Sequence, residues 1–257
     1  MKKLILLVTL VVSSIAGEFE DDMAQCKSGD MTGCHNLGVD YRDAIGTKPD
    51  IKKALKYFQI ACDGGVAEGC YNIGVEYLNG VTVKQDIDKA KSYFKKACNS
   101  DYGTACYVLG VLEVRGSKDF KKMDRYFTKA CDLNSTEGCK MAGLLYHDKT
   151  IGHVDMPKAI SFYEKACSLG DMNSCNNMGA FYENGIVVKK DLNRAIELYT
   201  KACNSGDASS CSNLGHIYAI GKGVKPNIPK ALELLKKACE GGSKNGCKGY
   251  KILTKGN

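Results

Sequence analysis

The sequence lacks several features that define common classes of enzyme. It contains no C-x-x-C motif, and only four histidines are spread along its 257 residues. Zinc sites need cysteine and histidine ligands at short, regular spacings, and dithiol redox enzymes use C-x-x-C. We therefore expect no metal site, no redox centre and no cofactor.

A long apolar run is also missing. The apolar run at residues 4–12 is roughly half the length that a membrane-spanning helix needs, which is about 20 residues. It follows Met1-Lys2-Lys3 and precedes Ser14-Ile15-Ala16, an order typical of a secretory signal peptide. We expect residues 1–17 to be a signal peptide. The mature chain, 18–257, would then have no membrane span and lie in the periplasm or outside the cell.

The excess of positive charge is small. The formal net charge is +7, from 36 basic and 29 acidic side chains. No basic block is interleaved with aromatic residues, so we do not expect nucleic-acid binding. A mild excess could steer anionic partners, but a solvated helix surface explains it equally well.

Cysteine is the residue that the chain has in abundance. Its 14 cysteines form seven pairs, each with seven residues between the two members. The pairs are Cys26/Cys34, Cys62/Cys70, Cys98/Cys106, Cys131/Cys139, Cys167/Cys175, Cys203/Cys211 and Cys239/Cys247. An even count with no cysteine left over fits a fully oxidised framework, which persists outside the reducing cytosol. We expect each cysteine to bond the one eight positions on, because any other connectivity would break the repeat symmetry.

The spacing of these pairs is periodic. Successive pairs start 36 residues apart, except for one step of 33 between Cys98 and Cys131. A fixed period of this size predicts a repeat solenoid. The loop at 115–118 is shorter than its counterparts, which accounts for the short step.

Each period predicts two helices. An aspartate or asparagine that can cap the first helix stands twelve residues before the first cysteine from the second pair onward. These caps are Asp50, Asp86, Asp119, Asp155, Asp191 and Asn227. An apolar stripe such as Ile51, Ala54, Phe58 and Ala61 follows at helical spacing. Between the two cysteines, residues that tolerate the left-handed conformation predict a tight turn.

The second helix of most periods carries the pattern Gly-x-x-Tyr. Glycine inside a helix costs about 1 kcal/mol relative to alanine. Its recurrence therefore predicts that another helix crosses closely at this point. The glycines are Gly38, Gly74, Gly110, Gly143, Gly179 and Gly215.

The combination of KA-x-x-YF-x-KA with N-x-G-x-x-Y-x-x-G resembles the Sel1-like repeat, a relative of the tetratricopeptide repeat. With C-x7-C in every unit, the chain is similar to the secreted Helicobacter cysteine-rich proteins. The resemblance implies an all-α fold: a right-handed superhelix of seven disulfide-stapled αα-hairpins, with a concave groove lined by the Gly-x-x-Tyr helices. Members of that family are described as penicillin-binding or weakly β-lactamase-like, and as proteins that the host immune system meets.

Candidate binding residues lie on the helix that would line the groove. Asparagine stands two residues after the second cysteine at Asn36, Asn72, Asn177 and Asn213, while Val108 and Met141 depart from the pattern. An asparagine ladder offers donors and acceptors to an extended peptide backbone. The resemblance to tetratricopeptide repeats supports this use. The alternative is that each asparagine bonds a neighbouring turn and only shapes the repeat.

Aromatic rings precede three of these positions. His35, Tyr71 and Tyr107 are expected to point into the same groove, where they either bind a partner or pack against the scaffold.

An enzymatic interpretation finds only scattered fragments. A penicillin-binding site needs S-x-x-K, S-x-N and K-T/S-G elements in one pocket. The fragments 92–95, 174–176 and 27–29 lie in the third, fifth and first units. Repeats of a solenoid contact only their neighbours, so these matches should not converge. We favour a secreted monomeric scaffold that binds protein or peptide partners, with a slow β-lactamase as the alternative.

Overall fold

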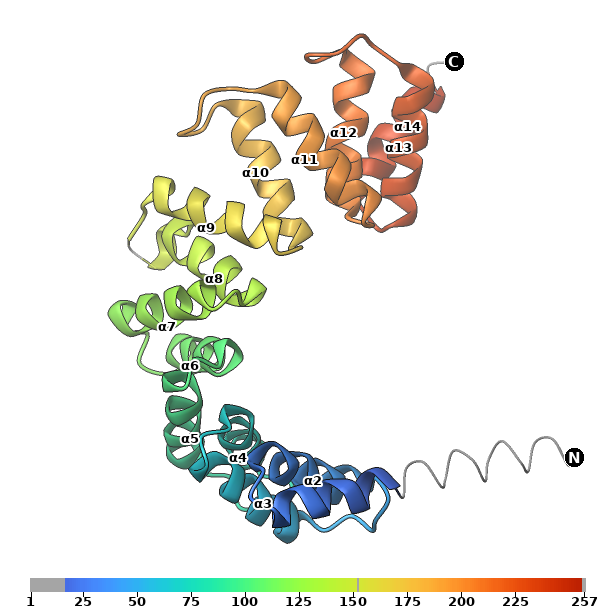
Figure 1. Ribbon diagram of the computed structural model, residues 1–257. Coiled ribbons are helices and arrows are strands. Elements are labelled where there is room, and N and C mark those ends of the chain that lie inside the picture. The colour runs from blue at the N-terminus through green and yellow to red at the C-terminus, as the bar shows by residue number, and fades with distance from the viewer. Residues whose placement is uncertain (1–16, 152, 256–257) are drawn as a thin grey trace, which may run out of the picture. The chain divides into compact units, whose positions relative to one another are not determined.

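The computed structural model describes residues 17–151 and 153–255, and these form helices and turns without a strand. A helix at residues 17–27 comes first. The others are α2 (Met31–Asp43), α3 (Ile51–Asp63), α4 (Ala67–Asn79), α5 (Ile87–Asn99), α6 (Gly103–Arg115), α7 (Phe120–Asp132), α8 (Thr136–His147), η1 (Lys149–Ile151), α9 (Met156–Ser168), α10 (Met172–Asn184), α11 (Leu192–Asn204), α12 (Ala208–Ile220), α13 (Ile228–Glu240) and α14 (Lys244–Lys255) (Figure 1). The all-α prediction is confirmed. Apart from Gly17, the expected signal peptide lies outside the described residues.

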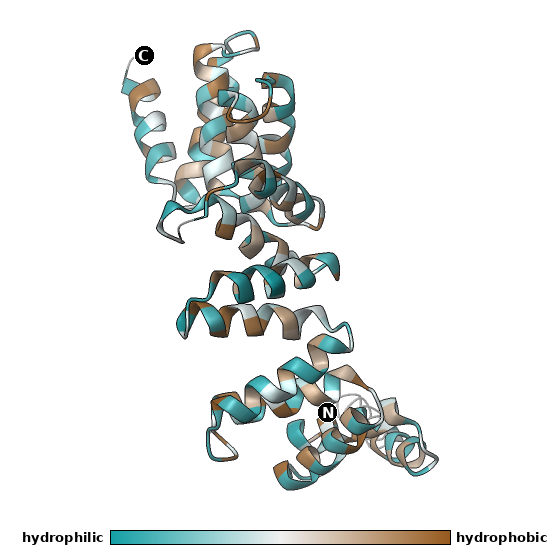
Figure 2. Ribbon diagram, turned by 90° about the vertical axis from the view of Figure 1, so that its left-hand side faces the viewer, coloured by the Kyte–Doolittle hydropathy of each residue, from teal (hydrophilic) through white to brown (hydrophobic). Residues whose placement is uncertain are grey.

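The chain divides into two compact units, Met1–Leu133 and Asn134–Asn257. In each unit, every helix packs on the next helix of the chain (Figure 1). Apolar and polar residues both occur on the helices (Figure 2), and α3, α5 and α7, for example, each bury one apolar stripe while their other residues face water. This is the stacked arrangement of a repeat solenoid.

The predicted caps place the start of the first helix of each hairpin. Each side chain accepts a hydrogen bond from the backbone N–H three residues on, as Asp50 does from Lys53 and Asn227 from Lys230. The remaining caps behave alike: Asp86, Asp119, Asp155 and Asp191. Because the cap is the same in each repeat, the apolar stripe that follows always faces the same neighbour.

The mid-helix glycines are points of close contact, as predicted. In the first unit, a Cβ added at Gly74 would lie 2.7 Å from Cε1 of Phe94, and one at Gly38 would lie 2.6 Å from Cδ1 of Phe58. In the second unit, Gly179 faces the ring of Tyr199 in the same way. The glycine belongs to the second helix of one hairpin, and the ring belongs to the first helix of the next hairpin. This contact therefore sets the distance between stacked hairpins.

Replacing Gly74 with alanine should destabilise the protein despite the higher helix propensity of alanine. Overpacking a core costs about 1–3 kcal/mol, whereas the propensity gain is about 1 kcal/mol. We expect a lower free energy of unfolding in a urea titration of the oxidised protein. Gly103→Ala at the first position of α6, where the nearest atom would be 3.2 Å away, is the control. A Gly74→Ala protein as stable as Gly103→Ala would contradict the close contact.

Disulfides join the two helices of a hairpin across the turn. Bonds link Cys26–Cys34, Cys62–Cys70, Cys98–Cys106, Cys167–Cys175, Cys203–Cys211 and Cys239–Cys247. Cys131 and Cys139 are disulfide-bonded as well. The pairing expected from the repeat is thus confirmed, and it indicates an oxidising environment outside the cytoplasm.

Removing one disulfide should measurably lower the free energy of unfolding. Closing a loop of about nine residues stabilises a fold by about 2.6 kcal/mol in the chain-entropy model. Cys203 and Cys211 are buried, so the double replacement by alanine avoids leaving a buried polar group. We expect the urea midpoint to fall. An unchanged midpoint would mean that helix packing alone holds the turn.

Tyrosines of the Gly-x-x-Tyr pattern make a second repeated contact. Tyr41 stacks on Tyr57 with ring centroids 5.6 Å apart, and Lys53 lies 4.9 Å above the Tyr41 ring. The same lysine-over-tyrosine contact occurs at Lys89 and Tyr77, Lys158 and Tyr146, and Lys230 and Tyr218. In the third hairpin Glu113 replaces the tyrosine and pairs with Lys91 at 3.6 Å. The ring is absent where the following loop is short.

Candidate functional site

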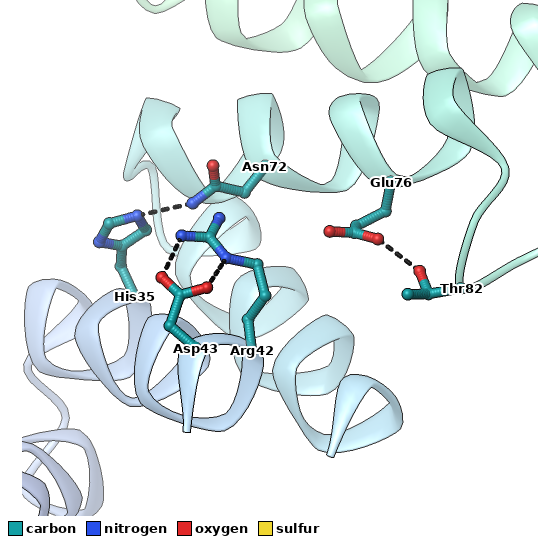
Figure 3. Close-up of polar contacts among 6 residues, drawn as sticks. All are labelled: His35, Arg42, Asp43, Asn72, Glu76 and Thr82. Atoms are coloured by element: carbon teal, nitrogen blue, oxygen red, sulfur yellow. Dashed lines mark hydrogen bonds and ion pairs between the residues drawn. The ribbon is translucent and has the colours of Figure 1, made fainter. Parts of the chain in front are cut away.

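The asparagine positions of the first unit are linked by side-chain hydrogen bonds. Asn72 Nδ2 lies 3.0 Å from His35 Nε2 (Figure 3). His35 Nδ1 lies 3.4 Å from Asn36 Oδ1, and Asn36 Nδ2 donates to Asp22 Oδ1 at 3.2 Å. A chain of polar contacts therefore runs from the helix at 17–27 through α2 to α4. All four side chains are half-buried.

The second unit repeats the geometry with other residue types. Asn213 Nδ2 donates to Asn176 Oδ1 at 3.0 Å, and Ser210 Oγ donates to the same oxygen at 3.0 Å. In both units the donor stands two residues after the second cysteine. Its partner stands one residue after the second cysteine of the preceding hairpin, 37 positions earlier. Asn176, which sequence reasoning missed, is therefore the counterpart of His35.

These bonds use the amide nitrogen and leave the oxygen. Within the described residues, the Oδ1 atoms of Asn72 and Asn213 accept no side-chain hydrogen bond, and Asn177 makes none at all. An amide oxygen can accept two hydrogen bonds. The neighbours thus orient the amide while its acceptor stays available to another molecule.

The three expected groove rings pack on the scaffold. His35 lies 5.7 Å from the ring of Phe58, and Tyr71 lies 5.6 Å from Phe94. The ring of Tyr107 is 6.3 Å from that of Phe127. Each ring is half-buried, so one edge remains open to solvent. Burial raises the pKa of Tyr71, which keeps its hydroxyl neutral.

A buried carboxyl group lies beside the first asparagine. Asp40 is 4% exposed, and its Oδ2 has no hydrogen-bond partner among the described residues. Its counterparts in the second unit are the buried Leu145, Phe181 and Ile217. Burial, together with the nearby charge of Asp22, raises the pKa of Asp40 to about 6.

The next carboxylate on α2 behaves in the opposite way. Arg42 donates to both oxygens of Asp43, at 2.7 and 2.8 Å (Figure 3). This pairing lowers the pKa of Asp43. Asp43 therefore stays ionised at the pH where Asp40 titrates.

Asp40 should make the protein less stable as the pH rises. A carboxyl whose pKa is higher in the folded state binds its proton more tightly there, so its contribution favours folding below about pH 4 and is lost as the pH rises through about 6. Asp40→Asn should raise the free energy of unfolding at pH 7 by about 1–3 kcal/mol and change it little at pH 4. Melting temperatures measured from pH 4 to 8 test this. Asp43→Asn is the control, because it should lower stability at pH 7; equal effects of both variants would refute the assignment.

The penicillin-binding fragments lie in unrelated surroundings. Ser92 and Lys95 are exposed on α5. Ser174 is buried in α10 of the other unit, and its Oγ has no hydrogen-bond partner among the described residues. Ser28 lies in the turn after the first helix, where it donates to the backbone oxygen of Gln25. The three fragments therefore lie on a helix surface, inside a helix and in a turn.

The described part of the chain lacks two other kinds of site. It contains no group of three or more histidine, cysteine, aspartate or glutamate side chains placed to hold a metal ion. None of its helices is both long enough and apolar enough to cross a membrane.

The structure and its repeated contacts define the class of protein: a disulfide-stapled α-helical repeat scaffold. The Sel1 repeat model matches residues 32–66, 67–102, 104–135, 140–171, 173–207 and 208–243, so the chain belongs to the Sel1 repeat family. No protein of curated function matches the sequence.

Several solved structures resemble the chain. A Sel1 repeat protein from Oxalobacter formigenes has a TM-score of 0.67 at 24% identity, over 86% of this chain and 99% of that one. The protective antigen c5321 of uropathogenic Escherichia coli has a TM-score of 0.57 at 23% identity, over 91% of this chain and 59% of that one. Helicobacter pylori cysteine-rich protein B is 39% identical over 51% of this chain and 93% of its own, with a TM-score of 0.42. The first two show the fold alone.

Proposed function

We propose that this protein is an exported scaffold that binds an extended peptide or protein segment along its Gly-x-x-Tyr helices. The observation that carries the proposal is the repeated amide geometry. In each unit a neighbouring hairpin holds the amide nitrogen of an asparagine, at Asn72 and Asn213, and leaves the oxygen available. An amide fixed before binding loses little side-chain entropy when a partner arrives.

The chemistry of these positions suits a main chain better than one particular side chain. Amide oxygens accept from backbone N–H groups, which every residue except proline offers. The half-buried rings of His35, Tyr71 and Tyr107 lie one residue before asparagine or its counterpart and remain partly exposed beside it. Together they would hold an extended segment through its backbone and contact its side chains without selecting a strict sequence.

The cellular location follows from the same framework. The disulfides require an oxidising compartment, and the expected signal peptide at 1–17 would deliver the chain there. We infer a periplasmic or secreted monomer whose partners are proteins or peptides of the cell envelope or of a host. A non-enzymatic role agrees with the scattered positions of the serine and lysine fragments.

Two asparagine replacements should separate binding from stability. Asn177 makes no side-chain hydrogen bond among the described residues, and Asn72 loses one bond when replaced by alanine. We expect Asn72→Ala/Asn177→Ala to weaken binding of a partner captured from periplasmic extract or host-cell lysate by about tenfold or more. The melting temperature should change little, because one hydrogen bond contributes about 1 kcal/mol.

The matched control is Asn79→Ala, since Asn79 is exposed at the end of the same helix α4. It should bind as the unmodified protein does. Equal affinity in the double variant would confine Asn72 and Asn177 to a structural role and refute the proposed function.

A further inference from the structure

Three positions on the second helix of a hairpin receive the next hairpin. In the first hairpin they are His35, Gly38 and Arg42, which stand one, four and eight residues after the second cysteine. All three meet Phe58 of α3. The His35 ring lies 5.7 Å from the Phe58 ring, a Cβ at Gly38 would lie 2.6 Å from its Cδ1, and the Arg42 guanidinium lies 5.8 Å from its centroid. These three positions are termed the stacking face.

The stacking face is used in the same way in the second unit. His147 Nδ1 lies 3.2 Å from the hydroxyl of Tyr163. In the following hairpin Gly179 faces the ring of Tyr199, and Glu183 Oε2 accepts from the Tyr199 hydroxyl at 2.8 Å. The residue types differ between hairpins. The place that they contact, four residues before the first cysteine of the next hairpin, stays the same.

On α14 the stacking face consists of lysines. Lys248, Lys251 and Lys255 occupy its three positions, and all are exposed. Residues 241–257 contain no aspartate or glutamate. None of the three lysines forms an ion pair with a described residue. This face of α14 is therefore a strip of cations.

The helices that pack against α14 do not neutralise this strip. α12 contains no acidic residue. On α13, Glu240 pairs with Lys236 at 3.9 Å. Glu233 is exposed on the side of α13 opposite the buried Ala231 and Leu235. The cations of the strip thus remain available to another molecule.

The helix at 17–27 carries acids at the matching positions. Asp22 stands at the counterpart of Phe58, and Glu18 at that of Ala54. Ala54 and Phe58 are 0% exposed, whereas Glu18 is exposed and Asp22 is half-buried, where it accepts from Asn36. The helix has four acidic residues and one cation. Its charge is therefore opposite to that of the strip on α14.

An ion pair inside the second unit shows how a lysine of the stacking face is used. Lys140, one residue after its second cysteine, lies 3.3 Å from Oδ2 of Asp171, which caps α10 of the next hairpin. The counterparts of this pair are Lys248 and Asp30, the cap of α2. Asp30 is exposed, and its Oδ1 accepts from the backbone N–H of Thr32 at 2.8 Å. Its other oxygen is available to a cation, as Oδ2 of Asp171 is to Lys140.

We propose that copies of this chain associate head to tail, with α14 of one copy against the helix at 17–27 of the next. Lys248 pairs with Asp30 across the contact, as Lys140 does with Asp171 within the chain. Lys251 and Lys255 face Glu18 and Asp22. Each copy carries both surfaces, so the contact is heterologous and can be repeated.

The contact depends on charge more than on apolar burial. Lys251 stands where stacked hairpins have glycine, so two copies cannot approach as closely as two hairpins do. Exposed ion pairs contribute little each and are screened by salt. The protein inferred above to be monomeric therefore remains so when dilute, and associates at high concentration and low salt.

Sedimentation velocity of the oxidised protein over a range of concentrations measures this association. We expect the mass to rise with concentration in about 0.01 M salt and to return to that of the monomer in about 1 M salt, where the Debye length is only about 3 Å. Asp30→Asn should weaken the association severalfold, because asparagine also caps a helix but carries no charge.

A charge swap tests which surfaces meet. Lys251→Glu/Lys255→Glu and Glu18→Lys/Asp22→Lys should each weaken self-association by about tenfold or more, because like charges then face each other. An equimolar mixture of the two variants should associate again, since each then offers the charge that the other needs. Both variants stay positively charged, because two reversals change the net charge of +7 by four. A general attraction between the variants therefore cannot explain recovery.

The matched control is Lys189→Glu/Lys190→Glu, which reverses two exposed lysines on the α10–α11 loop. It should associate as the unmodified protein does, and melting temperatures show whether each variant is folded. A mixture that stays monomeric, or association that persists in Lys251→Glu/Lys255→Glu, would overturn the proposal. So would a protein that stays monomeric in low salt but binds phosphatidylglycerol vesicles through these lysines.

Discussion

The contact on which the structure depends is an aromatic or leucine side chain lying on a bare helix backbone. Gly74 meets Phe94 and Gly179 meets Tyr199 at distances that leave no room for a Cβ. The glycine weakens its own helix, and the ring that covers it restores that loss by burying apolar surface. Since this contact is made between hairpins, it sets how the hairpins of each unit stack.

The polar features of the candidate site follow from this spacing. When two hairpins approach closely, side chains one position out of register meet: Asn72 reaches His35, and Asn213 reaches Asn176. The disulfides act on a different contact, the turn within a hairpin. The two devices together make each hairpin stiff and each stack regular, which is what a preorganised binding surface requires.

At a few positions one repeat of this chain has a residue type that differs from the other repeats. Glu113 replaces a stacking tyrosine where the loop is short, and Asp40 stands in the first hairpin at a position where the hairpins of the second unit have a buried apolar residue. Val187 has φ +65° at a position where the loops of the first and sixth repeats have Gly46 and Gly223. The repeat explains how the chain folds, whereas these substitutions distinguish one repeat of this chain from another.

Local periodicity was enough to predict the helices, their caps, the cysteine pairing and the glycine crossings. Each depends on residues a few positions apart or on a strict period, which the sequence displays directly. Packing between hairpins decided the rest. Three features arise from contacts between separate helices, at positions where the repeats differ. They are the hydrogen bond of Asn176 with Asn213, the raised pKa of Asp40 and a depression of the second unit lined by Leu144 and Phe181. No periodic pattern encodes such contacts, because they arise only once neighbouring hairpins are stacked.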